Sequence, residues 1–193
     1  MNPASAASPV VSAGHPVAVR NILSVLLGSL LVAVCAQVSI PLWFTPVPIT
    51  LQTFAVLLLG LLLSPGAAAA SMLLYLAEGA VGLPVFSPHS PTGMLHLLGP
   101  TGGYLLSYPF AAALTSFLCT RMARPGFFGS LFAATAGSFV ILLCGAAWLG
   151  AISHQPPTST LTLAVLPFLP GDILKIAAAA GAAGGLRRSR RHV

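Results

Sequence analysis

Acidic residues are almost absent from this chain of 193 residues. It contains two, Glu78 and Asp172, beside seven arginines and a single lysine, Lys175. Many hydrolase and transferase mechanisms need positioned carboxylates for general acid–base work, so this inventory argues against an enzyme. Phosphate-binding loops of the G-x-x-x-x-G-K-[ST] type and the G-x-S-x-G nucleophile motif are missing as well. We therefore expect no catalytic residues and no ATP hydrolysis by the chain itself.

Metal-binding patterns are also missing. The three cysteines, Cys35, Cys119 and Cys144, lie in separate apolar stretches, without metal-ligand spacing and without an even-numbered extracellular set. Two of the five histidines, His89 and His96, share one loop that contains no carboxylate. The sequence therefore predicts cysteines that serve as small packing residues, no metal site and no cofactor.

Apolar residues dominate what remains. They make up 56% of the chain, charged residues make up only 5%, and the mean hydropathy is +0.96. These values lie far from the composition of a soluble domain. Several apolar stretches are long enough for helices that cross roughly 30 Å of hydrocarbon. We predict an all-α integral membrane protein with one domain, and lipid as its main surroundings.

Six stretches are predicted to be membrane-spanning helices packed in one bundle. The last is predicted to start at Pro170, because proline is tolerated in the first helical turn and disruptive further in. Residues 159–169 are then an irregular or short helical lead-in. At 1.5 Å per residue, the 17 residues from Pro170 to Leu186 extend about 25 Å, nearly a full crossing. The six stretches are residues 22–40, 49–63, 67–83, 103–119, 127–152 and 170–186.

The arginines predict that both ends of the chain are cytoplasmic. With six spans, all seven fall on one side: Arg20, Arg121, Arg124, Arg187, Arg188, Arg190 and Arg191. The positive-inside rule makes that side cytoplasmic. We expect a disordered cytoplasmic tail over 1–20, a membrane domain over 21–186 and a basic tail over 187–193. The rival interpretations are a cleaved signal peptide at the N-terminus and a C-terminal patch for nucleic acid or anionic lipid. We favour the interpretation that the arginine-rich C-terminus sets the topology of the helices, and we expect no nucleic-acid binding.

Three segments on the outer side contain polar groups that could bind a ligand. Residues 40–53 read IPLWFTPVPITLQT, residues 82–104 end in the glycine-rich GPTGGY, and residues 169–175 read LPGDILK. An ionisable pair within a membrane helix indicates a functional site. Composition alone leaves open an interfacial aromatic belt for the first segment, a flexible turn for the second, and a simple i,i+3 ion pair for the third.

Four segments resemble the signature segments of the BioY family. They are FTPVPITLQTFAVLLLGLLL, MLLYLAEGAVGLPVF, GPTGGYLLSYPFAA and LPFLPGDILK, in that order, between about residues 36 and 180. Members of that family are the biotin-specific S components of energy-coupling-factor (ECF) transporters. The resemblance implies a six-helix S-component fold and high-affinity capture of biotin at the cell membrane. It also implies a transmembrane T component and a pair of ATP-binding-cassette ATPases as partners, which alone would use ATP.

The same resemblance implies a ligand pocket that faces outward. Its aromatic, threonine and glutamine positions in the first loop match Trp43, Thr45 and Gln52, and its ionisable pair matches Asp172 and Lys175. Its glycine-rich segment matches Thr101, Gly102, Gly103 and Tyr104. Phe86 is predicted to supply an apolar wall together with Trp43 and Tyr104. The resemblance supports ligand contacts from Ser87 or His89 least directly, since the middle of the second loop matches the family pattern less regularly.

Small residues on the first helix are the expected partner interface. Ser29 and Ala33 form a small-xxx-small pair, as do Ser24 and Gly28, and such pairs let another helix approach closely. Family members dock their T component through such a surface, so we expect the same of Ser29 and Ala33, with packing inside the bundle as the alternative. The remaining alternatives for the whole chain are an S component for another vitamin and a purely structural or assembly membrane protein.

Overall fold

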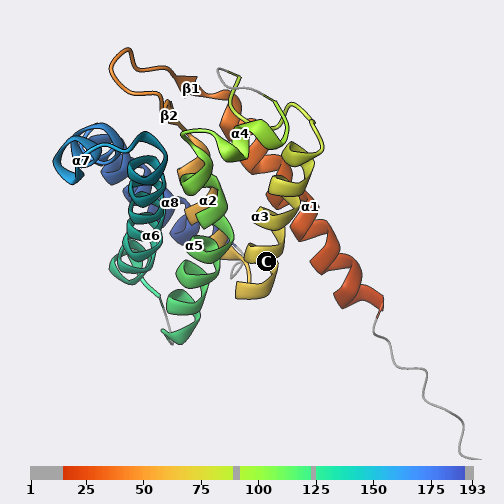
Figure 1. Ribbon diagram of the computed structural model, residues 1–193. Coiled ribbons are helices and arrows are strands. Elements are labelled where there is room, and N and C mark those ends of the chain that lie inside the picture. The colour runs from red at the N-terminus through yellow and green to blue at the C-terminus, as the bar shows by residue number, and fades with distance from the viewer. Residues whose placement is uncertain (1–14, 89–91, 123–124, 190–193) are drawn as a thin grey trace, which may run out of the picture.

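Each of the six apolar stretches forms a helix, which confirms the all-α class. The computed structural model describes residues 15–88, 92–122 and 125–189. In it the six stretches become α1 (His15–Gln37), α2 (Gln52–Leu62), α3 (Pro65–Ala80), α5 (Gly102–Arg121), α6 (Phe127–Ser153) and α8 (Leu169–Ser189), as Figure 1 shows. The connections contain two short helices, α4 (Met94–Leu98) and α7 (Pro157–Ala164), and a hairpin of β1 (Ser39–Ile40) and β2 (Ile49–Thr50).

Local sequence signals explain several helix ends. The hydroxyl of Ser64 accepts a hydrogen bond from the backbone N–H of Ala67 at 3.4 Å, and Pro65 occupies the first helical position of α3. This is an N-cap followed by a proline in the position where its missing N–H costs nothing. Helix α8 begins at Leu169 with Pro170 in its first turn, as predicted, and the lead-in before it contains the short helix α7.

Three predicted boundaries are wrong. Helix α1 already begins at His15, so residues 15–20 of the expected tail are helical. Helix α8 continues to Ser189, so Arg187 belongs to a helix rather than to a tail. Helix α2 begins only at Gln52, because residues 49–50 pair with residues 39–40 across the hairpin. The N–H of Leu51 extends this pairing by donating to the carbonyl of Val38 at 3.0 Å.

Helix α2 lies at the centre of the bundle. It packs against α1, α5, α6 and α8, and eight of its eleven residues are buried. A helix that is apolar on every side is stable only inside such a core. Eleven residues extend about 16 Å, roughly half of the hydrocarbon thickness. Helix α2 therefore fills the interior of the bundle and does not cross a bilayer by its own length.

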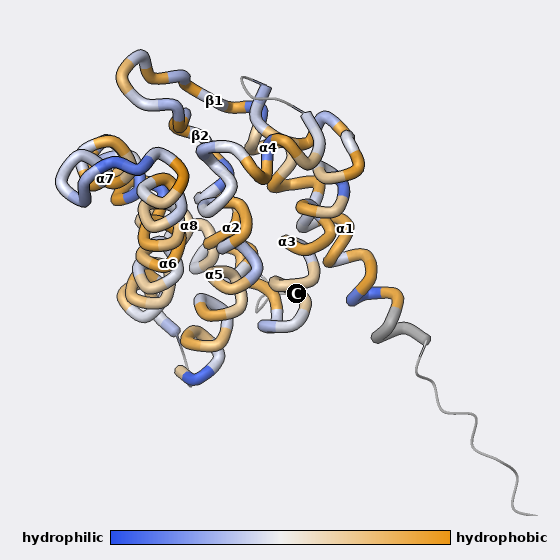
Figure 2. Tube along the Cα trace, viewed as in Figure 1, coloured by the Kyte–Doolittle hydropathy of each residue, from blue (hydrophilic) through white to orange (hydrophobic). Residues whose placement is uncertain are grey.

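The outer surfaces of the helices are apolar, as expected of a membrane protein. Leu23, Leu27 and Leu30 on α1 and Phe128 and Phe139 on α6 are more than half exposed. Figure 2 shows apolar residues along α1 and α6, and hydrophilic residues gathered in the segment that leads into α7. Among the described helices, residues 19–37 and α6 are long and apolar enough to cross a membrane, and the bent pair of α7 and α8 could form a third span. Six crossings, with cytoplasmic termini, remain a prediction.

The small residues of α1 face α3 of the same bundle. Ser29 is fully buried, and its hydroxyl donates to the Oε2 atom of Glu78 on α3. Ala33 belongs to the buried core. A Cβ atom added at Gly28 would lie 2.5 Å from the Oγ atom of Ser71 on α3. The expectation that Ser29 and Ala33 lie on a surface open to a partner is therefore corrected: both are buried within the bundle, and Ser29 contacts α3.

Enlarging Ser29 should therefore destabilise the bundle. Ser29→Leu introduces a side chain where α1 contacts α3 and strands the carboxyl group of Glu78, and overpacking alone costs about 1–3 kcal/mol. Leu30→Phe is the matched control, since Leu30 is exposed. Thermal unfolding in detergent should show a lower Tm for Ser29→Leu and an unchanged Tm for Leu30→Phe. A wild-type Tm for Ser29→Leu would mean that Ser29 faces outward after all.

Candidate functional site

A cavity lies at the hairpin end of the bundle. It holds about 520 Å³ of empty space, its mouth included, and its walls come from the hairpin, α2, α4, α5, α6 and α8. The apolar walls are Val47, Pro48, Leu105, Ile141, Leu142 and Phe168. The polar lining consists of Thr50, Gln52, Thr53, Ser87, His96, Thr101, Tyr104, Tyr108, Asp172 and Lys175. An apolar enclosure with a few convergent polar groups is typical of a small-molecule site.

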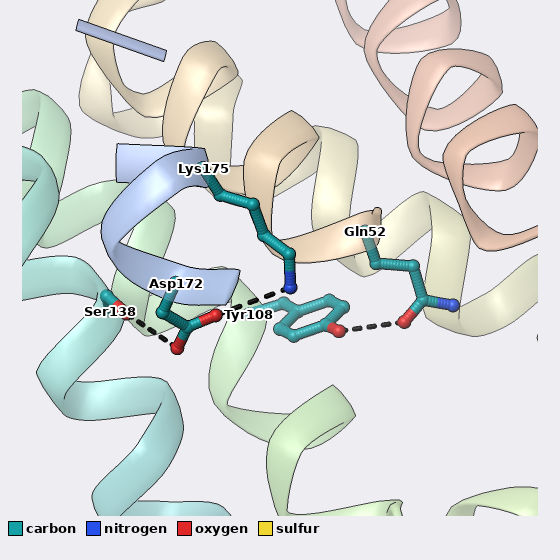
Figure 3. Close-up of polar contacts among 5 residues, drawn as sticks. All are labelled: Gln52, Tyr108, Ser138, Asp172 and Lys175. Carbon is teal, nitrogen blue, oxygen red and sulfur yellow. Dashed lines mark hydrogen bonds and ion pairs between the residues drawn. The ribbon is translucent and has the colours of Figure 1, made fainter. Parts of the chain in front are cut away.

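The ion pair of Asp172 and Lys175 forms one wall of this cavity. The Nζ atom of Lys175 lies 3.3 Å from the Oδ1 atom of Asp172, one helical turn apart on α8. The Oδ2 atom accepts a hydrogen bond from Ser138 of α6 at 3.2 Å. Figure 3 shows both side chains projecting from α8 toward Tyr108. Asp172 also lies in the first turn of α8, where the helix dipole favours a negative charge.

A chain of hydrogen bonds crosses the bundle beside the pair. Tyr108 of α5 donates to the Oε1 atom of Gln52 at 2.8 Å, and the amide nitrogen of Gln52 donates to the hydroxyl of Tyr75 at 3.0 Å. Tyr75 then donates to the carbonyl of Val85 at 3.3 Å. Since Tyr75, Gln52 and Tyr108 are all buried, each bond also satisfies a group that would be costly to leave unpaired. The chain fixes the orientation of the Gln52 amide next to the cavity.

The corner between α7 and α8 is held to the rest of the cavity by two hydroxyl groups. Tyr104 of α5 donates to the carbonyl of Ala164 at 2.6 Å, and Thr45 of the hairpin loop donates to the carbonyl of Leu163 at 3.0 Å. Both carbonyls belong to the last turn of α7, where a helix has no partners of its own. These bonds position Phe168, which packs against the ring of Tyr104 and closes that side of the cavity.

One polar atom of the cavity wall has no partner among the described residues. The hydroxyl of Thr53 on α2 is buried and makes no hydrogen bond there, although Thr53 lines the cavity. A buried hydroxyl without a partner costs about 1–3 kcal/mol, so such groups are rare in native structures. Its position in the cavity wall makes a bound ligand the natural partner.

The cavity brings together half of the site residues expected from the sequence. Gln52, Thr101, Tyr104, Asp172 and Lys175 line it. The other five, Trp43, Thr45, Phe86, Gly102 and Gly103, do not. Thr45 instead acts indirectly, through its bond to the end of α7. His89 lies outside the described residues, whereas Ser87 does line the cavity.

Trp43 and Phe86 are expected from the sequence to form aromatic walls of the cavity, but the structure places both of them elsewhere. Trp43 is 95% exposed in the hairpin loop and contacts Phe44 edge-on. Phe86 is buried, but between the rings of Tyr75 and His96 rather than at the cavity surface. The apolar walls come instead from Phe168 and from aliphatic residues of the hairpin loop, α5 and α6.

Gly102 and Gly103 serve helix packing. A Cβ atom at Gly103 would lie 2.2 Å from the Cβ atom of Trp148 on α6, and one at Gly102 would lie 2.0 Å from the carbonyl oxygen of Leu97. No side chain fits at either position without a shift of the backbone. The glycines let α5 approach α6 and α4 closely, which brings Thr101 and Tyr104 to the cavity.

Sequence reasoning missed several cavity residues. Tyr108 follows Tyr104 by four residues, so both lie on one face of α5, and this spacing could have revealed it. Thr53 directly follows the expected Gln52, whereas Thr50 lies in the 40–53 segment that is expected to supply polar groups. Ser138, which donates to Asp172 without lining the cavity, gave no signal, since it is one of several small residues in a long apolar helix. His96 lines the cavity and packs on Phe86, but its loop contained no recognisable motif.

Breaking the ion pair from one side should destabilise the protein more than removing both charges. Asp172→Leu leaves a buried ammonium without its carboxylate, at a cost of about 3–5 kcal/mol. The double variant Asp172→Leu/Lys175→Met removes both charges and should recover most of the loss in Tm. Ile173→Leu, at an exposed position of the same helix, is the control. Equal Tm values for the single and double variants would contradict a desolvated pair.

Comparisons with known proteins agree with this geometry. The sequence model of the BioY family matches residues 6–192. A protein of Pyrococcus horikoshii named "Probable biotin transporter BioY" is 39% identical over 149 residues, which cover 77% of this chain and 85% of that protein. The "Biotin transporter BioY" of Rhizobium etli is 32% identical over 166 residues, which cover 82% of this chain and 88% of the relative.

A solved structure shares the fold. The crystal structure of the S-component for biotin from an ECF-type ABC transporter superposes with a TM-score of 0.84 at 27% identity, and the match covers 92% of this chain and 95% of that one. The shared fold and the family match over nearly the whole sequence lead to the same assignment. The chain belongs to the BioY family of biotin transporters.

Proposed function

We propose that this protein captures biotin from outside the cell as the S component of an ECF-type transporter. The observation that carries the proposal is the cavity, whose wall contains the Asp172–Lys175 ion pair and the hydroxyl of Thr53, which has no partner among the described residues. Relatives that match more than three quarters of the chain are named as biotin transporters, which supports biotin as the ligand.

The chemistry of biotin suits the groups that line the cavity. Biotin has a ureido ring with two N–H donors and one carbonyl acceptor, an apolar sulfur ring and chain, and a carboxylate. Asp172 can accept from N–H groups, Lys175 can donate to an oxygen, and Thr53 can do either. Phe168 and the aliphatic walls would cover the apolar part. Either polar end of biotin could meet Lys175, and both orientations use the same residues.

The proposal includes partners and location. We infer a multi-pass protein of the cell membrane that works with a transmembrane T component and a pair of ATP-binding-cassette ATPases. The chain itself is then neither an enzyme nor a cofactor-binding protein, and ATP is used only by the ATPases. This division of labour agrees with a sequence that has two acidic residues and no phosphate-binding loop. A nearly apolar helical surface supports the lipid environment.

The direct test is biotin binding by the purified protein. We expect protein from biotin-grown cells to contain about one biotin per chain by mass spectrometry of the denatured sample. After the biotin is removed, titration calorimetry should show saturable binding, with no displacement by thiamine or riboflavin at equal concentration. Displacement by another vitamin, in protein that contains no biotin, would reassign the substrate, and the absence of any vitamin would reject the transport proposal.

The Thr53 hydroxyl gives a second test. Thr53→Val removes the hydroxyl and keeps the shape, so the empty protein loses an unsatisfied group and its Tm should stay the same or rise. If biotin forms a hydrogen bond with the Thr53 hydroxyl, removing the hydroxyl removes that bond, which contributes about 0.5–1.5 kcal/mol. Biotin binding should then be weaker by roughly 2- to 13-fold. Thr135→Val, at an exposed position of α6, is the control. A lower Tm with unchanged biotin affinity would mean that Thr53 has a structural role only.

A further inference from the structure

Arg187 joins the ends of four helices at the end of the bundle away from the cavity. Its guanidinium donates to the carbonyl of Leu61, to the hydroxyl of Ser130 at 3.0 Å, to the Sγ atom of Cys119 at 3.0 Å and to the carbonyl of Pro125 at 3.4 Å. These acceptors lie at the end of α2, in the first turn of α6, at the end of α5 and in the loop between α5 and α6. We call this arrangement the Arg187 clamp.

The clamp satisfies groups that the helices leave unpaired. Leu61 is the penultimate residue of α2, so its carbonyl has no partner within the helix. A cation at the C-terminal ends of α2 and α5 is also favoured by their helix dipoles. A guanidinium has five N–H donors in a fixed planar fork, which an ammonium cannot reproduce. The neighbouring Arg188 is exposed, and among the described residues it makes none of the hydrogen bonds of the clamp.

Helix α8 connects the clamp to the cavity. Its first turns contain Asp172 and Lys175 and its last turns contain Arg187, 15 residues or about 22 Å beyond Asp172. Helix α2 likewise begins with Gln52 at the cavity and ends beside Leu61 at the clamp, and the two helices pack along each other. A shift of α8 along α2 would therefore break the clamp and move the ion pair away from Gln52 and Tyr108.

We propose that Arg187 is a positioning residue for the ligand site, which fixes α8 along its axis relative to α2, α5 and α6. Because coupling between two sites is reciprocal, a ligand in the cavity tightens the clamp, and the clamp strengthens ligand binding. The state of the cavity is thereby registered at the opposite end of the bundle, the predicted cytoplasmic side. The inference rests on the proposed function, since biotin is the ligand used in its test.

Cys119 provides a reporter for the clamp. It is buried under the guanidinium, and replacing Cys35 and Cys144 with alanine leaves it as the single thiol. We expect slow labelling of Cys119 by N-ethylmaleimide in the empty protein, and labelling at least fivefold slower at saturating biotin. A ligand also slows any labelling that proceeds through global unfolding, so the response supports a positioning role only if it is lost in a clamp variant that still binds biotin.

Three variants complete the experiment. Arg187→Gln should label Cys119 at least tenfold faster, with no further effect of biotin, and should weaken biotin binding about fivefold or more. Arg187→Lys keeps the charge without the fork and should recover part of both effects. Arg188→Gln removes a cation from the neighbouring exposed position and should match the parent protein in labelling and affinity.

The outcomes separate this inference from the proposed function. Two results would overturn the positioning role and leave biotin capture intact. One is native biotin affinity in Arg187→Gln. The other is a labelling rate of the parent protein that does not change when biotin binds. If the parent protein itself binds no biotin, the proposed function fails and the role of Arg187 in ligand binding fails with it. Unchanged labelling of empty Arg187→Gln would overturn the clamp itself.

Discussion

The need to pair two opposite charges inside an apolar bundle shapes the rest of the site. A lone charge in the middle of a membrane helix costs about 2.5–3.5 kcal/mol on insertion scales, and Asp172 is only 5% exposed. Lys175 supplies the partner and Ser138 a hydrogen bond. Both contacts depend on α8 beginning at Leu169, with Pro170 in its first turn, so that the pair lies in its first turns beside the cavity. Because the two charges are already paired with each other, the protein is folded without a ligand, and the same two groups can form hydrogen bonds with a polar ligand.

The same constraint applies to helix ends, whose carbonyls have no water to bind within a membrane. Tyr104 and Thr45 donate to the last carbonyls of α7 at one end of the bundle, and Arg187 donates to that of Leu61 at the other. Each donor comes from a different segment of the chain. Side chains that satisfy helix ends thereby also fix how the helices lie against each other, and hence the shape of the cavity.

The sequence predicted well what depends on composition and local spacing. Apolar runs located the six helices, proline located the start of α8, and two ionisable residues three positions apart located the cavity wall. It predicted poorly which way residues face, because a helix that is apolar all round has little amphipathic pattern to read. Ser29 therefore faces α3 rather than a partner, and Trp43 points outward. The contact of Ser138 with Asp172 joins residues 34 positions apart, which no local pattern encodes.

The central claim is that the Asp172–Lys175 pair binds biotin rather than merely holding α8 in place. The most direct measurement is the biotin Kd of the Asp172→Leu/Lys175→Met variant, under conditions where its Tm shows that it is folded. Loss of a charge-assisted hydrogen bond of about 1.5–3 kcal/mol predicts binding roughly 10- to 150-fold weaker than wild type. A folded double variant with near-native affinity would contradict the account, since the pair would then be only a structural ion pair.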